Sequence, residues 1–302
     1  MHRMLAILLF SSLAAAQAPS PQPASAMAGE AAKTAAEDPN AKKARDLLDL
    51  AVKALGGQAY LTAQTRGEEG RWYHLHHGSS GGSSGVQYRQ FSQFPDKDRL
   101  EIYGRGNVLI PLPLPYSVDV IVVSKKAGKS DLVVIHNGDK GYDITNKGTS
   151  SQDKDDLKAH LRRRQHSLEQ VFRKWVNDPN MQYFYDGMAI VDAKPTDKVT
   201  LLSNQNDSVT VFLDQFSHLP LKSSYTWRDP EDKQKNTEEE IYDNYRLVQG
   251  IMTPHSITRT YNGEMSHQRF INTARYNMSF EQSIFDATVD YDPMAPPPLK
   301  KK

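Results

Sequence analysis

Hydrophobic positions at helical spacing predict two helices in this chain. Residues 41–55 place their leucines and small apolar residues on one stripe, and Asn40 is expected to cap the first turn. Gly56 and Gly57 follow directly, which signals a helix end because glycine adopts the left-handed conformation at little cost. Residues 153–177 predict a second, longer helix. Its apolar face is expected to contain Leu157, Leu161, Leu168, Val171, Phe172 and Trp175.

Alternation of residue types with a period of two predicts about a dozen strands in the rest of the chain. The clearest group is 239–248, 251–261 and 265–278, which follow one another with short turns. Asn262-Gly263 forms the second turn, and this dipeptide is the strongest short hairpin signal. The three segments therefore predict a long antiparallel meander in a large curved sheet. The other predicted strands are 70–77, 86–94, 98–103, 118–124, 132–135, one ending near Ile144, 182–191, 198–203, 208–214 and 219–227.

The order of these elements predicts an α+β fold that is mainly antiparallel β. Strands and helices do not alternate one by one, which disfavours a doubly wound parallel sheet. A dozen strands curled around only two helices leave a concave face that the helices need not fill, and such faces are common ligand sites. The plainer interpretation is an ordinary core on which the helices pack.

The N-terminus predicts export. Residues 1–3 are a short basic start, residues 4–13 are apolar, and Ala16-Gln17-Ala18 matches a signal-peptidase site, so 1–18 is the expected signal peptide. Residues 19–40 are rich in Ala, Pro, Ser and Gln and predict a disordered leader, and 292–302 predicts a disordered tail. The chain has no cysteine, so neither a disulfide nor a lipid-modified cysteine is available. A soluble protein of a bacterial periplasm is the favoured interpretation.

Charge gives no case for a nucleic-acid partner. The 302 residues carry 37 basic and 36 acidic side chains, a formal net charge of +1. Beyond the expected signal peptide, no apolar stretch approaches the ~20 residues of a membrane-spanning helix. Nucleic-acid binding and membrane spanning are therefore both disfavoured.

The faces of the predicted strands supply candidate cavity residues. Tyr225 shares a face of its strand with Trp227, and Tyr245 shares one with Leu247. Aromatic and aliphatic side chains thus gather on one face, while many opposite positions are polar. The residues expected to line an apolar cavity are Trp72, Tyr88, Leu100, Ile102, Trp175, Phe212, Tyr225, Trp227, Tyr245 and Leu247.

Several short segments of the chain resemble those of a known superfamily. The segments are Ala54-Leu55-Gly56-Gly57 at the helix end, 211–214 followed by 219–222, and 242–246. With the exported N-terminus and the order of strands, helix and strands, they make most of residues 41–285 similar to the periplasmic lipoprotein carriers. These proteins are the LolA-like, or outer-membrane-lipoprotein-sorting, superfamily.

The resemblance implies a single domain over residues 41–291. Its fold would be a strongly curved, open half-barrel with the N-terminal and mid-chain helices on the concave face. The implied function is a non-enzymatic carrier or sensor, without a cofactor, that receives lipid, lipoprotein acyl chains or another amphiphile in an apolar cavity. Shielding a methylene from water is worth ~0.8 kcal/mol, so such a cavity needs no reactive group. The implied partners are a lipid or acylated protein and, transiently, an inner- or outer-membrane assembly, with a monomer favoured.

One apolar segment, 108–116 (VLIPLPLPY), has three prolines and is therefore excluded from a central strand. In the plainer interpretation it packs over the core as an edge. In the other it is an exposed loop at the cavity mouth that touches a membrane or a partner. The residues expected to make that contact are Leu109, Ile110, Leu112 and Leu114.

Other functions remain open. His74 and His76 would project from one strand face, an arrangement compatible with a metal-dependent hydrolase. No cysteine, HExxH motif or closely spaced acidic residue accompanies them, so the metal site is the weaker interpretation. The basic run 162–164 is interpreted as a solvated helix face, with anionic headgroups as an alternative contact. A structural role beside an outer-membrane assembly is a third possibility.

Overall fold

The structure, a computed structural model, describes residues 38–75, 85–103 and 130–295 of the chain. From Asp38 onward these residues belong to one unit. No helix among them is long and apolar enough to cross a membrane. The expected signal peptide, the leader as far as residue 37, the strand expected at 118–124, the proline-rich segment 108–116 and residues 296–302 of the tail lie outside the described residues.

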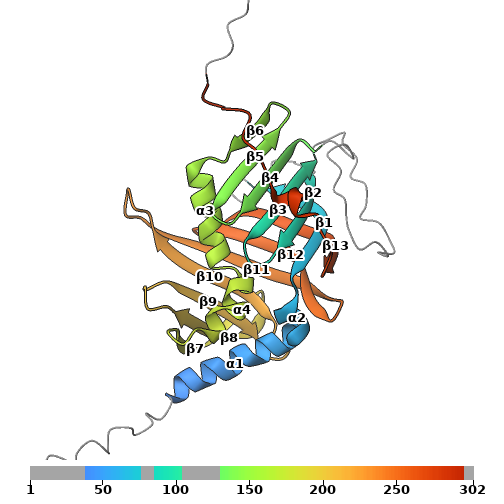
Figure 1. The fold of residues 1–302 in the computed structure, drawn as a ribbon. Coiled ribbons are helices and arrows are strands. Elements are labelled where there is room, and N and C mark those ends of the chain that lie inside the picture. Colours follow the sequence, from blue (N-terminus) through green and yellow to red (C-terminus); the bar gives the residue numbers. More distant parts are fainter. Residues whose placement is uncertain (1–37, 76–84, 104–129, 296–302) are drawn as a thin grey trace, which may run out of the picture. The chain divides into compact units, whose positions relative to one another are not determined.

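Thirteen strands of the described residues form one antiparallel sheet (Figure 1). Most of them match predicted period-two segments, but β1, β8 and β11 begin four or five residues earlier than expected, and a short strand after residue 147 was not predicted. The strands are β1 (Thr65–His74), β2 (Val86–Gln93), β3 (Lys97–Tyr103), β4 (Leu132–Asn137), β5 (Lys140–Thr145), β6 (Gly148–Ser151), β7 (Gln182–Val191), β8 (Lys194–Leu202), β9 (Ser208–Asp214), β10 (Pro220–Arg228), β11 (Lys235–Val248), β12 (Ile251–Tyr261) and β13 (Glu264–Tyr276).

The sheet is open. Its order is β6-β5-β4-β3-β2-β1-β13-β12-β11-β10-β9-β8-β7, so β6 and β7 are the two edges. Two meanders, β1 to β6 and β7 to β13, meet where β1 pairs with β13. The predicted open, curved, mainly antiparallel α+β fold with an N-terminal and a mid-chain helical segment is confirmed.

Six helical segments complete the described fold. The segment 152–181, which we call the strap, connects the edge strand β6 to the opposite edge strand β7. It crosses the sheet, and α3 lies in front of β10 and β11 in Figure 1. The helices are α1 (Pro39–Leu55), α2 (Gln58–Thr62), α3 (Lys154–Gln165) and α4 (Leu168–Arg173), with the 3₁₀ turns η1 (Trp175–Asn177) and η2 (Gln282–Phe285).

Helix α1 begins earlier than predicted. Asp38, and not Asn40, is its cap, because the Asp38 carboxylate accepts the Asn40 backbone N–H at 3.0 Å. Pro39 suits the first helical position, where no N–H is required. The Asn40 side chain instead donates to the Tyr185 carbonyl at 2.9 Å and accepts the Tyr185 N–H at 2.8 Å. Asn40 therefore covers part of the edge of β7, which would otherwise offer unpaired backbone groups.

The end of α1 agrees with the prediction. Gly56 has a φ of +128°, and a Cβ on it would lie 2.4 Å from the Gly250 carbonyl oxygen. Glycine is therefore required both by the backbone conformation and by the close approach of the turn between β11 and β12.

The mid-chain helix is not one helix, which corrects the prediction. It breaks at His166 and Ser167, and the Ser167 hydroxyl accepts the Gln170 N–H at 3.3 Å to cap α4. Helix α3 buries none of its side chains, so Leu157 and Leu161 are only half-buried. The reason is its composition, since three arginines occupy its last turn and the cavity described below lies beneath it. The buried apolar face belongs to α4 and η1 alone.

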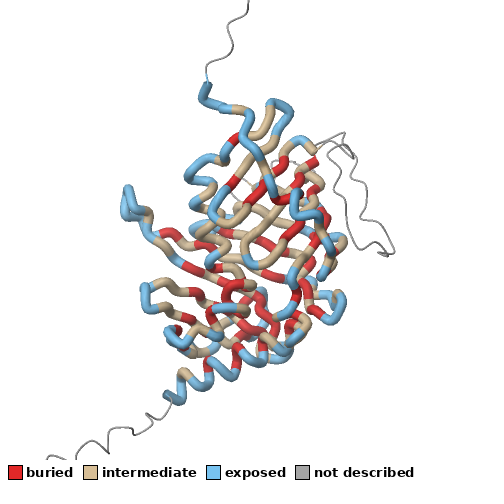
Figure 2. Tube along the Cα trace, in the orientation of Figure 1, coloured by how far each residue is buried: buried red, intermediate tan, exposed pale blue. Residues whose placement is uncertain are grey.

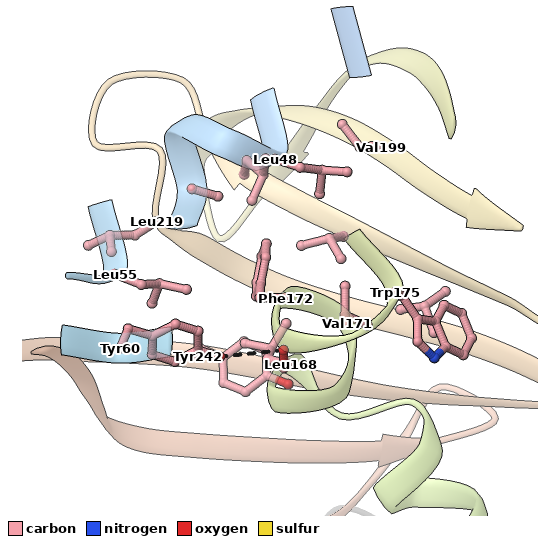
Figure 3. Packing of buried hydrophobic residues seen from close by; sticks show 14 of the residues in the cluster. Leu48, Leu55, Tyr60, Leu168, Val171, Phe172, Trp175, Val199, Leu219 and Tyr242 are labelled. Carbon is pink, nitrogen blue, oxygen red and sulfur yellow. Dashed lines mark hydrogen bonds between the residues drawn. The ribbon is translucent and has the colours of Figure 1, made fainter. Parts of the chain in front are cut away.

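The apolar core lies between α1, α4, η1 and the sheet (Figures 2 and 3). Phe172 and Val171 of α4 are fully buried there beside Leu48 of α1. Tyr60 of α2 packs edge to face on Phe172 and donates its hydroxyl to the Leu168 carbonyl at 3.4 Å. The helices thus fill one part of the covered face with apolar side chains and leave the part beneath α3 to other residues.

Candidate functional site

A cavity of about 370 Å³ lies between the strap and the sheet. Its floor comes from β1 to β4 and β11 to β13, and its roof from α3 and α4. Residues directly opposite each other on paired strands share a face, and the pairs Gln90–Leu100 and Leu100–Val134 both line the floor. The register of the sheet therefore gathers side chains from both meanders in one place.

Most residues of the lining are polar or charged, whereas the sequence predicted aromatic and aliphatic residues there. Five residues provide apolar surface: Trp72, Phe94, Pro95, Leu100 and Val134. Three histidines, eight cationic side chains and four carboxylates provide most of the rest. The cationic residues are Arg66, Lys97, Arg163, Arg164, Arg173, Lys174, Arg259 and Arg269, and the carboxylates are Asp98, Asp156, Glu169 and Glu240.

Two floor arginines share a buried carboxylate outside the lining. Glu68 is 0% exposed; its oxygens lie 3.3 Å from Arg66 Nε and 3.3 Å from Arg269 Nη1. The Tyr88 hydroxyl donates to it at 3.0 Å. Burial would raise the pKa of Glu68, but Arg66 and Arg269 hold that pKa below its usual range. The positive charge of these arginines is thus partly neutralised from within the sheet, and Arg66 also reaches Glu169 of α4 at 3.2 Å.

The third floor arginine has its own partner. Arg259 Nε donates to Glu240 Oε1 at 3.1 Å across the β11–β12 pair. Burial opposes ionisation of Glu240, yet Arg259 lowers the pKa of this carboxylate to about 2. Both carboxylates of the floor pairs are therefore ionised at neutral pH.

The roof arginines differ from those of the floor. Arg164 Nη1 donates to the Gly138 carbonyl at 2.6 Å and to the Asp96 carbonyl at 3.2 Å. Arg173 Nη1 donates to the Ala63 carbonyl at 2.6 Å, and its Nε and Nη2 are buried without a hydrogen-bond partner. Within the described residues, no carboxylate oxygen lies within 4.0 Å of Arg163, Arg164 or Arg173.

The cavity histidines add no positive charge at neutral pH. The rings of His136 and His160 stack with 3.3 Å between centroids, and His136 Nε2 lies 3.0 Å from Gln152 Oε1. Burial, and next the neighbouring His136, lowers the pKa of His160 to about 2. Burial, and next Arg259, lowers the pKa of His267 to about 2. The local charge therefore depends on the arginines, lysines and carboxylates.

Comparison with known proteins identifies the fold. No family model and no curated protein matches the sequence. Among solved structures, a DUF1329 family protein from Desulfovibrio piger has a TM-score of 0.51 at 13% identity, over 80% of this chain and 97% of that one. A putative outer membrane lipoprotein-sorting protein domain from Vibrio parahaemolyticus has a TM-score of 0.47 at 11% identity, over 82% of this chain and 97% of that one. A LolA superfamily protein from Nitrosomonas europaea has a TM-score of 0.45 at 10% identity, over 81% of this chain and 97% of that one.

The chain shares the fold of the DUF1329 family protein. At 13% identity the likeness extends to the fold alone. The cavity lies on the face of the sheet that the helices cover.

Only two of the predicted cavity residues line this cavity. They are Trp72 and Leu100. Tyr88 is fully buried, packs edge to face on Trp72 and holds Glu68, so it supports the floor without reaching the cavity. Ile102 is half-buried on β3 and lies outside the lining.

Three further candidates belong to the apolar core. Trp175 of η1 and Tyr225 of β10 are buried in it, and Tyr225 stacks on His166 with 4.0 Å between centroids. Tyr245 packs against the same core and donates its hydroxyl to the Pro220 carbonyl at 2.6 Å. They stabilise the fold and do not line the cavity.

The last three candidates lie elsewhere. Trp227 is covered by the Arg162 guanidinium, 3.5 Å from its ring centroid. Phe212 lies between the buried Val211 and Leu213, so it projects from the opposite face of β9, under the Lys222 ammonium. Leu247 is 70% exposed near the end of β11. None of these three residues lines the cavity described above.

The remaining predicted sites fall largely outside the described residues. These are His76 and the proposed mouth residues Leu109, Ile110, Leu112 and Leu114. His74 is exposed on β1. Within the described ranges, no three His, Cys, Asp or Glu side chains gather in a way that would hold a metal ion.

Sequence reasoning missed most of the polar lining, although a signal for it exists. Glu240 stands two residues before the buried Tyr242, and Arg259 two residues after the buried Ile257. A charged residue on the apolar face of a strand indicates either a buried pair or a site. The arginine run was recognised, but the sequence did not distinguish Arg163, which lines the cavity, from Arg162, which does not.

Proposed function

We propose that this protein is a non-enzymatic carrier or sensor that binds an amphiphilic molecule in the cavity beneath the strap. The observation that supports this is the cavity itself, about 370 Å³ on the helix-covered face of the sheet. Ligand sites for small molecules typically measure 300–1,000 Å³. A cavity in that range, with both apolar and polar lining, suits a ligand that has both kinds of surface.

The apolar side chains of the lining all lie outside the strap. Trp72, Leu100 and Val134 offer apolar surface on the sheet beside its charged residues, while the strap contributes only polar and charged side chains. Each methylene that leaves water for such a surface contributes ~0.8 kcal/mol. The ligand class we propose is therefore a lipid, the acyl group of a lipoprotein or another amphiphile, with the polar end beneath α3 and α4.

The setting that fits this function is the bacterial periplasm. The expected signal peptide at residues 1–18 and the two similar structures whose names refer to lipoprotein sorting and to LolA agree with it. The proposed partners are a lipid or an acylated protein and, transiently, a membrane assembly that delivers or receives the ligand.

A pair of matched variants tests this function. Val134→Phe adds volume inside the cavity, whereas Leu247→Phe adds it at an exposed position far from the lining. We expect delipidated protein to bind a fluorescent fatty acid and Val134→Phe to weaken that binding at least about ten-fold, a loss of about 1.4 kcal/mol. Leu247→Phe should bind like the unmodified protein.

The measurements are fluorescence titration and mass spectrometry of the organic extract from the purified protein. Circular dichroism of both variants shows whether they fold, so that weaker binding caused by a smaller cavity can be distinguished from loss of the fold. The proposal is wrong if delipidated protein binds no fluorescent amphiphile, or if folded Val134→Phe binds as tightly as Leu247→Phe does.

A further inference from the structure

We propose that the strap makes this cavity selective for ligands that carry an anionic group, a carboxylate or a phosphate. The residues that would bind the anion are Arg163 and Arg164 of α3 and Arg173 of α4. This inference rests on the proposed function, which places an amphiphilic ligand in the cavity. It adds the chemical class of the ligand's polar group.

The first argument is the charge of the cavity. Eight cationic side chains and four carboxylates line it. Glu68 adds a fifth carboxylate from within the sheet, beside Arg66 and Arg269. Even with Glu68 included, cations exceed carboxylates, and the three histidines do not change the balance at neutral pH because the pKa of each is lowered by burial. An anion would reduce this excess.

The second argument is where the excess lies. The floor arginines Arg259 and Arg269 have carboxylate partners, and so does Arg66. Arg163, Arg164 and Arg173 have no carboxylate oxygen within 4.0 Å among the described residues. The hydrogen bonds of Arg164 and Arg173 end on backbone carbonyls. The arginines without a carboxylate partner are thus concentrated in the roof of the cavity, and all three belong to the strap.

The third argument is the number of unused donors. Arg173 Nε and Nη2 are buried and have no hydrogen-bond partner. A guanidinium offers five N–H groups in a fixed fork that matches the oxygens of a carboxylate or phosphate. Buried donors without a partner are costly, so a ligand that accepts from Arg173 gains interactions that the described part of the chain does not supply.

The lining also contains carboxylates, which restrict where the anionic group of a ligand can lie but do not prevent its binding. Asp98 is the floor carboxylate that faces the cavity without an arginine partner, and its Oδ1 accepts from Ser92 Oγ at 2.7 Å and from Gln90 Nε2 at 3.3 Å. Asp156 of α3 lines the cavity as well. A ligand with one anionic end and an apolar remainder satisfies the roof without adding a second charge near Asp98.

The electrostatics of Arg163 agree with this placement. Arg163 is half-buried, and burial followed by the nearby Arg259 lowers the pKa of its guanidinium. Two cations beside each other in a partly dry cavity repel, and an anion between them offsets that repulsion. Arg163→Gln is therefore expected to fold at least as stably as the unmodified protein, which makes it a usable probe.

The test compares ligands that differ only in the polar end. Dodecanoic acid, dodecyl phosphate and dodecanol share one chain length, and inorganic phosphate has no chain. We expect the unmodified protein to bind the two anionic amphiphiles at least about ten-fold more tightly than dodecanol, as measured by isothermal titration calorimetry. Arg163→Gln and Arg173→Gln should reduce this preference by about ten-fold, while Arg163→Lys should retain part of it.

Arg246→Gln is the control variant, because it makes the same change of net charge at an exposed position of β11. It should leave the preference unchanged. Inorganic phosphate distinguishes the sources of the anion. Tighter binding of dodecyl phosphate than of inorganic phosphate indicates a lipid headgroup, and equal binding indicates a free anion; both support an anion site if Arg163→Gln weakens them.

The inference is overturned if dodecanol binds as tightly as dodecanoic acid, or if Arg163→Gln and Arg173→Gln keep the full preference. In that event binding of all three amphiphiles would still support the proposed function. If inorganic phosphate alone binds in an Arg163-dependent manner, the anion site is supported and the proposed amphiphile carrier fails.

Discussion

Glu68 keeps a negative charge inside the sheet because three side chains surround it. Strand alternation directs it to the face covered by the strap, and the neighbouring strands β2 and β13 bring Tyr88 and Arg269 beside it. Arg66 approaches from two residues earlier on the same strand. One carboxylate thus holds together strands from both meanders at the place where they join.

Replacing Glu68 by Gln is expected to destabilise the protein by about 3 kcal/mol. The substitution leaves Arg66 and Arg269 buried with less opposite charge, and an uncompensated buried charge is the costly outcome of breaking such a group. Urea unfolding followed by circular dichroism measures the change. Glu281→Gln, at an exposed position before η2, is the control and should change the free energy of unfolding by less than about 0.5 kcal/mol. Equal stability of both variants would contradict this account of Glu68.

At the scale of elements, the strap consists of two helices with different supports. Helix α4 is anchored by buried Leu168, Val171 and Phe172, whereas α3 buries no side chain. Polar contacts hold α3, among them the Arg162–Glu238 ion pair and the bonds from Arg164 to backbone carbonyls. Local stability follows buried apolar contacts, so we expect α3 to be the less stable of the two strap helices.

Hydrogen exchange should show this difference between the two helices. We expect the backbone amides of α3 to exchange at least about ten-fold faster than those of α4, because opening α3 exposes little apolar surface. Mass spectrometry of peptic peptides from residues 154–165 and 168–173 provides the comparison. If the two helices exchange at the same rate, the strap opens as a single unit and access to the cavity requires disruption of the apolar core.

The strands could be predicted from the sequence because their signals are local. Period-two alternation and turn dipeptides such as Asn262-Gly263 depend on few neighbours, and β11 to β13 appear where they were expected. The break in the mid-chain helix was missed because His166 and Ser167 interrupt no apolar repeat. The face of Phe212 was missed because its neighbours Val211 and Leu213 are apolar too, so alternation gives no sign of which face is buried.

The polarity of the cavity could not be predicted, since it depends on pairing between distant segments. Arg269 faces the cavity only because β13 shifts register against β1 between Glu69 and Gly70, and that bulge leaves no pattern in the sequence. The strap arginines face the same space only because residues 152–181 connect opposite edges of the sheet. Such contacts are decided by the whole fold.

At the scale of the whole molecule, the cavity histidines His160 and His267 predict how stability depends on pH. The pKa of His160 and that of His267 are each about 2 in the folded protein and near ~6.5 in an unfolded chain. Below about pH 6.5 the unfolded state binds protons that the folded state does not. Stability should therefore fall as the pH is lowered from 7 to 5, by about 2 kcal/mol for each histidine.

Urea unfolding at pH 7 and pH 5 measures this loss. In His160→Gln the fall between the two pH values should be smaller by about 2 kcal/mol, because one of the two groups no longer titrates. His74→Gln, at an exposed position, should show the same fall as the unmodified protein. An identical fall in all three proteins would show that other groups control the pH dependence.

The strap joins the two edges of the open sheet, since residues 152–181 run from the end of β6 to the start of β7. In helical form the twelve residues of α3 span about 18 Å, whereas the same residues fully extended would span about 40 Å. The helical content of the strap therefore limits how far β6 and β7 can move apart. A ligand too tall for the space beneath the strap would have to unwind α3.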